Sequence, residues 1–231
     1  MRDILPALSE WYAAGRPFGL ATVVAVSRSA PRDPGAAMAV GPGDKAVGSV
    51  SGGCVEGAVF ELAKEVVRSG EARLETFGYS DEDAFAVGLT CGGEITLLVR
   101  PVTRETDPGF AAVARSVAEG RPVTVATVTD GPARVGATLA VWPDEVSGTL
   151  GPTGLDVAVT ADARGELALG ATGLRHYGPH GERREDAVTV FLHSFAPPPR
   201  MLVFGAIDYA AAVARIGSFL GYRVTVCDAR P

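Results

Sequence analysis

A stretch near the N-terminus of this sequence recurs about 100 residues later. Residues 16–26 read RPFGLATVVAV and residues 121–128 read RPVTVATV; a proline, a Gly-Ala pair and a short apolar run follow both copies in the same order. A helical pattern ending in glycine precedes each copy. Because a fixed-period repeat indicates duplicated structural units, we predict that residues 1–195 form one domain of two related halves, about 1–100 and 105–195, around a pseudo-two-fold axis.

The two halves differ where reactive residues gather. The first half reads SGGCVE at residues 51–56 and the second reads PTGLDV at 152–157, an alignment that pairs Cys54 with Leu155. The second half also has no counterpart of the GLTCGG sequence at 88–93. We therefore expect the chemistry to lie within residues 28–93 and the second half to be a structural partner.

A different pattern begins after the proline run at 197–199. Residues 196–200 are predicted to be an extended linker. Beyond it, an apolar run at 201–205, helical spacing at 209–220 and a second strand pattern at 223–227 follow the order of the first β-α-β of a dinucleotide-binding fold. The predicted fold class is therefore α/β: an internally duplicated α+β domain (1–195) followed by a partial, truncated Rossmann-like segment (201–231).

Composition excludes several classes of protein. Hydrophobic residues make up 47% of the chain and charged residues 21%, which excludes wholesale disorder. The net charge of −6 argues against a nucleic-acid partner. No apolar run approaches the roughly 20 residues of a membrane span, and the N-terminus is too mixed for a signal peptide. Three cysteines, an odd number, indicate free thiols in a reducing compartment. We expect a cytoplasmic protein.

Cys54 is the first candidate for a functional residue. It follows Ser51, Gly52 and Gly53 and precedes an amphipathic helical pattern from about residue 55 to 68. A glycine-rich turn into a helix presents backbone N–H groups to an anion, and a thiol at that place is biased towards thiolate. The alternative is a small buried cysteine at a helix start.

Cys91 and Arg32 extend this candidate site. Cys91 adjoins Gly92 and Gly93 just before a strand pattern, so two loops, each with a cysteine beside a glycine pair, are expected to meet at one pocket. The spacing is not that of a zinc site, which needs four ligands. Arg32, in the turn at 28–38, offers a guanidinium for bidentate anion binding; the alternative is a solvated turn.

Three segments of the first half together form a longer pattern. It comprises Pro31-Arg32 with Gly35-Ala36 and Met38, then residues 48–56, then residues 88–93. In this order they resemble the XdhC/CoxI family, the accessory proteins of xanthine dehydrogenase and related molybdenum hydroxylases, and the resemblance extends over the C-terminal β-α-β. It implies a protein that binds the molybdenum cofactor (molybdopterin), protects it while its sulfur ligand is installed, and delivers it to the apo-hydroxylase.

The resemblance also implies roles for the candidate residues. The molybdenum is thiophilic, so Cys54 and Cys91 are expected to line the cofactor site, either as ligands of the metal or only as part of the pocket wall. Arg32 or the backbone of residues 51–54 is expected to bind the terminal phosphate. The predicted cofactor-binding set is Cys54, Cys91, Arg32, Ser51, Gly52, Gly53, Gly92 and Gly93. The implied partners are an apo-hydroxylase and a cysteine desulfurase.

Two further interpretations compete with this one. The first is a nucleotide-binding oxidoreductase or xanthine dehydrogenase component that uses NAD(P). Ile207 argues against it, because its branched side chain stands where a pyrophosphate would approach the backbone. The second is a protein-interaction module with incidental thiols. A lone β-α-β leaves strand edges and an apolar face uncovered, so either the protein is longer or another subunit covers that face; we expect a homodimer.

Overall fold

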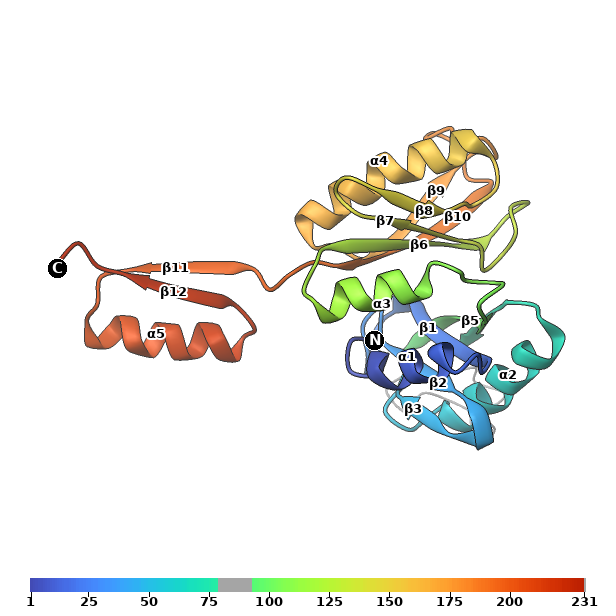
Figure 1. Ribbon diagram of the computed structural model, residues 1–231, viewed down its shortest axis with the longest axis horizontal. Coiled ribbons are helices and arrows are strands. Elements are labelled where there is room, and N and C mark those ends of the chain that lie inside the picture. Colours follow the sequence, from blue (N-terminus) through green and yellow to red (C-terminus); the bar gives the residue numbers. More distant parts are fainter. Residues whose placement is uncertain (79–92, 231) are drawn as a thin grey trace. The chain divides into compact units, whose positions relative to one another are not determined.

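A computed structural model describes residues 1–78 and 93–230. The chain divides into two compact units, Met1–Phe195 and Ala196–Pro231, each of mixed α/β structure. The first unit contains two five-stranded sheets with the same strand order, β3-β2-β1-β5-β4 and β8-β7-β6-β10-β9 (Figure 1). The predicted duplicated α/β fold is thereby confirmed.

The elements of the two halves follow one another in the same sequence. Those of the first half are α1 (Leu5–Ala13), β1 (Phe18–Ser27), β2 (Ala37–Val40), the 3-10 turn η1 (Pro42–Asp44), β3 (Ala46–Gly48), α2 (Glu56–Ser69), β4 (Arg73–Phe77) and β5 (Glu94–Val102). Those of the second are α3 (Phe110–Ala118), β6 (Val123–Asp130), β7 (Thr138–Val141), β8 (Val146–Gly148), α4 (Thr153–Leu169), β9 (Gly173–Tyr177) and β10 (Val188–Phe195).

Each sheet buries one face under a long helix. Helix α2 presents Val59, Ala63 and Val66 to the first sheet, and α4 presents Val159, Ala163 and Leu167 to the second. This spacing of three to four residues places the apolar side chains on one stripe of each helix. The result is one core between sheet and helix in each half.

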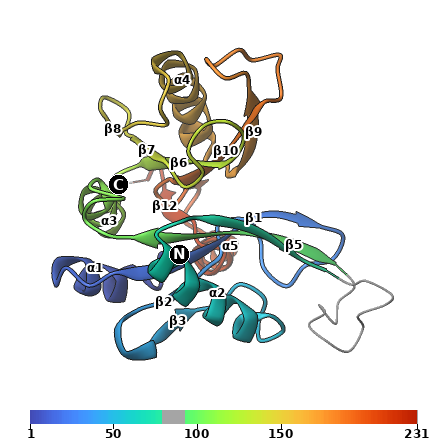
Figure 2. The same cartoon turned by 90° about the vertical axis from the view of Figure 1, so that its right-hand side faces the viewer.

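The opposite faces of the two sheets face each other, with α1 and α3 between the halves (Figures 1 and 2). A third core there combines α1, α3 and both sheets, with aromatic rings such as Trp11, Phe18 and Phe110 in contact. Two short helices that precede their sheets in sequence thus pack on each other across the repeat.

Contacts between the halves are reciprocal. A Cβ on Gly35, in the β1–β2 loop, would lie 2.8 Å from Nε2 of His193 on β10. A Cβ on Gly136, in the β6–β7 loop, would lie 3.7 Å from Cβ of Arg100 on β5. Arg100 and His193 occupy equivalent places, because they pair with Leu20 of β1 and Val125 of β6 respectively. The β1–β2 loop of the first half thus approaches β10 of the second, and the β6–β7 loop of the second half approaches β5 of the first. Such reciprocal contacts are expected when two halves are related by a pseudo-two-fold axis.

The structure corrects the alignment of Cys54 with Leu155. Val55 and Leu155 are both fully buried under their sheets, as are Val59 and Val159 further along. Burial therefore pairs Leu155 with Val55, and the counterpart of Cys54 is Gly154. The sequence comparison was shifted by one residue because it matched letters without knowing which side chains enter the core.

The second unit is a single β-α-β. Strand β11 (Arg200–Phe204) pairs in parallel with β12 (Arg223–Cys227), and α5 (Asp208–Phe219) connects them. The Ala206 backbone N–H donates to Oδ2 of Asp228 (2.6 Å), and Arg230 donates to both oxygens of that carboxylate. The Arg230 guanidinium, followed by the backbone N–H groups of Ala206 and Arg230, lowers the pKa of Asp228. Asp228 thus links the turn after β11 to the end of β12.

Candidate functional site

A glycine pair, Gly52-Gly53, stands directly before Cys54, and Val55 separates Cys54 from the helix that follows. Gly52 and Gly53 have φ of +77° and +121°, which side-chain-bearing residues rarely adopt, and α2 begins only at Glu56. In the second half Pro152 has φ of −64° and α4 begins immediately at Thr153. The positive-φ glycines therefore hold Cys54 in a loop, where its counterpart Gly154 is already helical.

The carboxylate of Glu56 organises this loop. Its Oε1 accepts hydrogen bonds from the Ser49 hydroxyl (2.6 Å) and from the backbone N–H groups of Val50 (3.2 Å) and Ser51 (2.9 Å). Its Oε2 accepts from the Ser51 hydroxyl and from the Gly53 N–H (2.8 Å). Five donors from four residues of the loop thus converge on one side chain.

These hydrogen bonds outweigh the cost of taking the charge from water. Burial by itself raises the pKa of Glu56, but the hydroxyls of Ser49 and Ser51 and the backbone N–H of Ser51 bring that pKa down to about 2. The carboxylate is therefore ionised at neutral pH and remains so well into the acid range. Glu56 therefore gives the loop a negative charge that its hydrogen bonds hold in place.

The same bonds limit what the loop offers to an external anion. Glu56 takes the N–H groups of residues 50, 51 and 53; the N–H of Gly52 donates to the Ser49 hydroxyl (3.0 Å), and that of Val55 to the Ser51 hydroxyl (3.0 Å). A phosphate here would compete with a resident carboxylate. Of the two phosphate-binding groups considered from the sequence, the geometry favours Arg32, whose side chain is exposed.

Cys54 itself is half-buried at the edge of the first core. Its side chain packs against the core under the first sheet, as do Ala30 and Ala36 from the β1–β2 loop. Among the described residues, 1–78 and 93–230, no disulfide joins it to another cysteine. A thiol in this position combines partial solvent access with a fixed backbone.

The structure brings a second predicted segment to this end of the sheet. A Cβ on Gly93 would lie 1.9 Å from the Ser29 carbonyl oxygen, so the start of β5 and the β1–β2 loop pass each other with no room for a side chain. Cys91 and Gly92, immediately before, lie outside the described residues. Gly93 is thus next to the loop that carries Arg32, on the half where Cys54 lies.

The second half keeps the carboxylate and loses the thiol. Asp156 accepts from the Thr149 hydroxyl (2.7 Å) and the Leu150 N–H (2.7 Å), as Glu56 does from Ser49 and Val50. Glu56 was not among the residues selected from the sequence. The repeated spacing of Ser49 to Glu56 and Thr149 to Asp156 was the signal that would have identified it.

No three His, Cys, Asp or Glu side chains within residues 1–78 and 93–230 gather as a metal site would require. In the same part of the chain, every helix is too short or too polar to cross a lipid bilayer. The described portion of the candidate site is thus a loop with one thiol, a half-buried carboxylate and an exposed arginine.

Comparison with known proteins matches this chain to one family. The model of the XdhC and CoxI family matches residues 11–78 and 116–178, more than half of the chain and parts of both halves of the repeat. Over 122 residues the chain is 35% identical to the "Molybdenum cofactor insertion chaperone PaoD" of Escherichia coli (strain K12), covering 53% of this chain and 37% of that protein.

Two longer relatives extend the similarity to the second unit. The chain is 25% identical over 218 residues to a probable xanthine dehydrogenase subunit of Bacillus subtilis (strain 168), covering 92% of this chain and 59% of that protein. A crystal structure titled as a xanthine dehydrogenase from Bacillus halodurans has the same fold with a TM-score of 0.60 and 22% identity, covering all of this chain and 63% of that one. The chain spans less than two thirds of each of these proteins.

Proposed function

This chain belongs to the XdhC and CoxI family, and from that premise we propose that it binds the molybdenum cofactor and assists its sulfuration and insertion into a hydroxylase of the xanthine dehydrogenase type. The observation that carries the proposal is the Cys54 loop: glycines and an internal carboxylate fix a half-buried thiol just ahead of a helix, and only in one of two otherwise equivalent halves. A relative named as a molybdenum cofactor insertion chaperone supports it.

The candidate residues fit the molybdenum end of the cofactor, and they restrict where its phosphate can bind. Thiolates suit a soft, thiophilic metal centre, so Cys54, together with Cys91 outside the described residues, would hold the molybdenum end. The internal bonds of Glu56 leave the backbone N–H groups of residues 50–53 already engaged. Arg32 would therefore bind the terminal phosphate, with Gly93 allowing the close approach of the second loop to the one that carries Arg32; Gly92 belongs to the proposed set and lies outside the described residues.

The chain's own contribution is to position and protect the bound group. Ser51, Gly52 and Gly53 set the direction of the Cys54 side chain, and Glu56 keeps that loop from rearranging when the cofactor leaves. A preorganised loop loses less conformational entropy on binding than a mobile one. The bound cofactor supplies the redox chemistry only after transfer to the apo-hydroxylase, which with a cysteine desulfurase is the proposed partner.

The experiment is to purify the protein from molybdopterin-producing cells and to measure the fluorescence of the oxidised pterin it carries. The proposal predicts that wild-type protein carries pterin and that the Cys54→Ser, Cys91→Ser double variant loses at least about nine tenths of it. Cys227→Ser, in the second unit, is the matched control and should load as wild type does. Undiminished loading of the double variant would sink the proposal.

Steady turnover of NAD(P) would favour the competing oxidoreductase. That function needs a pyrophosphate near the turn after β11, where the Ala206 N–H donates to Asp228 and Ile207 is 57% exposed. We expect no saturable binding of NAD(P) by calorimetry.

A further inference from the structure

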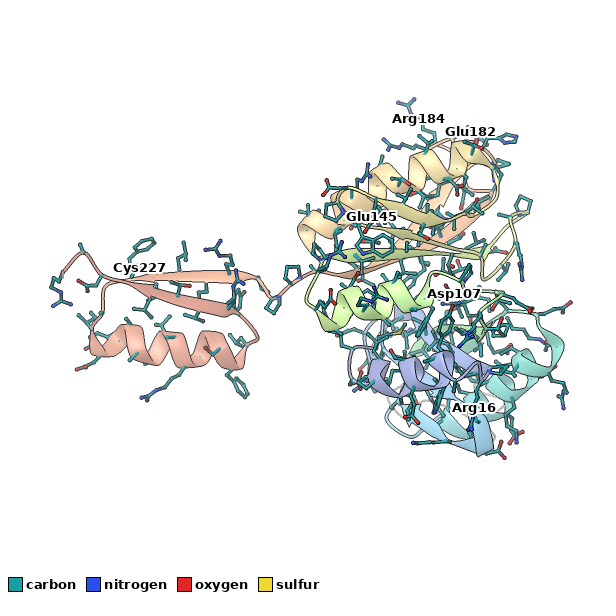
Figure 3. All side chains as sticks on the ribbon, in the orientation of Figure 1. Arg16, Asp107, Glu145, Glu182, Arg184 and Cys227 are labelled. Carbon is teal, nitrogen blue, oxygen red and sulfur yellow. The ribbon has the colours of Figure 1, made fainter. Side chains whose placement is uncertain are left out.

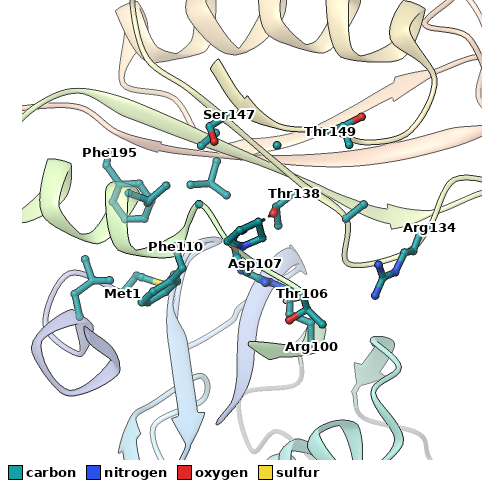
Figure 4. A pocket seen from close by; sticks show the side chains of 18 residues that line it. Met1, Arg100, Thr106, Asp107, Phe110, Arg134, Thr138, Ser147, Thr149 and Phe195 are labelled. Atoms are coloured by element: carbon teal, nitrogen blue, oxygen red, sulfur yellow. Dashed lines mark hydrogen bonds and ion pairs between the residues drawn. The ribbon is translucent and has the colours of Figure 1, made fainter. Parts of the chain in front are cut away.

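A cavity lies between the two halves, away from the Cys54 loop (Figure 4). It has a volume of about 200 Å³ and is bordered by the segment before α3, by β7 and by the end of β8. Asp107, one of its lining residues, lies between the halves in the view of Figure 3. An apolar cavity of about 150 Å³ already holds one benzene ring, so this one has room for a single substituted ring.

The cavity exists because the repeat is broken at one position. Ile4 and Gly109 each precede a nine-residue helix, α1 or α3, with nearly the same backbone angles (φ −97°, ψ −13° and φ −77°, ψ −12°). In the first half the Ile4 side chain fills the space beside Gly48, since a Cβ on Gly48 would lie 3.0 Å from Cγ2 of Ile4. In the second half Gly109 leaves the corresponding space beside Gly148 open.

One wall of this cavity is mainly apolar and aromatic, and the other is polar. Phe110, Phe195 and Met1 lie on one side, and Arg134, Arg100 and Thr106 lie on the other (Figure 4). Aromatic side chains on a wall favour a flat ring. The opposite side carries hydrogen-bond donors, which suits an anionic substituent.

Of the two arginines that line the cavity, Arg100 forms an ion pair and Arg134 does not within the described residues. Arg100 is buried and donates from Nη2 to Oδ2 of Asp107 (2.8 Å), which is also buried, so this pair is electrically balanced. Arg134 is exposed at the rim, and within the described residues no ion pair to its guanidinium is formed. It also borders a neighbouring hollow that shares Arg100 and Thr106. The lining therefore carries a net positive charge.

We propose that this cavity is a second small-molecule site that binds a single aromatic ring bearing a carboxylate or similar anionic group. The ring lies against Phe110 and Phe195 and the anionic group against Arg134. The site does not involve Cys54, so it stands or falls independently of the cofactor-binding proposal.

The probe is 4-fluorobenzoate, observed by fluorine NMR, with uncharged 4-fluorobenzamide as its partner. The proposal predicts saturable binding of the carboxylate in the millimolar range, the affinity expected for about ten non-hydrogen atoms, and binding of the amide weaker by about threefold or more. Absence of saturable carboxylate binding overturns the proposal.

Three variants locate the binding. Gly109→Ile, which places in the second half the side chain that Ile4 has in the first, should lower affinity at least about tenfold by filling the cavity. Gly109→Ala, whose Cβ meets only the Ser147 hydroxyl at 3.7 Å, gives a milder test should the isoleucine variant not fold. Arg134→Gln should reduce the preference for the carboxylate over the amide.

Gly165→Ala is the matched control, because a Cβ on that helical glycine meets nothing within 4 Å and the residue lies on α4. It should bind the probe as wild type does. If Gly109→Ile folds with an unchanged melting temperature or a higher one and still binds 4-fluorobenzoate with wild-type affinity, the probe is bound elsewhere and the proposal is wrong.

Discussion

The loops at residues 49–56 and 149–156 share one arrangement of a carboxylate and its donors, and they differ in their glycines and in one thiol. Each is held by a carboxylate at the start of a long helix that accepts from a hydroxyl and a backbone N–H at its beginning. Only the first has the positive-φ pair Gly52-Gly53 and the thiol of Cys54. The carboxylate is therefore part of the shared architecture, and the thiol is what distinguishes one half from the other.

Sterics explain why the second loop cannot carry a cysteine. A Cβ on Gly154 would lie 2.2 Å from the carbonyl oxygen of His180, and one on Gly181 would lie 2.4 Å from that of Gly154. The backbone of the β9–β10 loop thus covers this position. A side chain has room at residue 54 and none at residue 154.

The largest effect is expected from Gly154→Cys. Since the backbone at His180 must move to admit the side chain, the free energy of unfolding should fall by about 3 kcal/mol, the upper part of the range for overpacking. The measurement is urea denaturation. The reverse exchange, Cys54→Gly, should cost about 1 kcal/mol, and equal losses for the two would show that the halves are sterically alike.

Removal of the two carboxylates should have the next largest effects, and unequal ones. Glu56→Ala leaves five donors without their acceptor and should cost about 2–3 kcal/mol of unfolding free energy. Asp156→Ala leaves two donors and should cost about 1–2 kcal/mol. A larger loss for Asp156→Ala would contradict the view that the first loop is the more tightly held.

A smaller effect is expected on how the free energy of unfolding depends on pH through Glu56. Because the pKa of Glu56 is about 2 when folded against 4.5 as the ordinary value, its stabilisation is fully present above pH 4.5 and is lost as the pH falls towards 2. With allowance for solvent screening, the loss is about 1–2 kcal/mol. Glu56→Gln should remove this part of the acid dependence, measured as unfolding free energy against pH.

His193 supplies an internal reference for that titration. Burial, followed by the N-terminal amine and Arg2, lowers the pKa of His193 to about 3, so the folded state excludes a proton that the unfolded state takes up. Stability should therefore already begin to fall below about pH 6.5, in wild type and in Glu56→Gln alike. The two proteins should differ above pH 5 by a constant offset in unfolding free energy, and a different slope against pH in that range would mean that a group other than Glu56 contributes to the difference.

Sequence reasoning predicted the parts of the fold that depend on local pattern. The repeat and the β-α-β order of the second unit are visible as apolar periodicity, turn glycines and the proline run. The strand order and the exchanged contacts of Gly35 and Gly136 are not, because they depend on which distant segments pair. The same limit produced the one-residue error at Leu155, since the letters alone do not show which side chains are buried.

The residues of the candidate site stay predictions, and the structure adds one residue that the sequence did not single out. Cys54, Ser51, Gly52 and Gly53 were selected because a glycine-rich turn before a helix has a recognisable sequence. Glu56 stood in the same motif, yet its role was missed because a carboxylate at a helix start is common and its five donors meet only in three dimensions. Cys91 and Gly92 lie outside the described residues, so even their position relative to Cys54 stays a prediction.

The most direct test of the central comparison is a titration of molybdopterin into the purified apoprotein, followed by fluorescence, for wild type, Cys54→Ser and Asp156→Asn. The thiol is assigned to binding and Asp156 to scaffold, so we predict that Cys54→Ser weakens binding at least about tenfold, or about 1.4 kcal/mol, and that Asp156→Asn leaves it within about twofold. Unchanged affinity in Cys54→Ser, or an equal loss in both variants, would contradict the account.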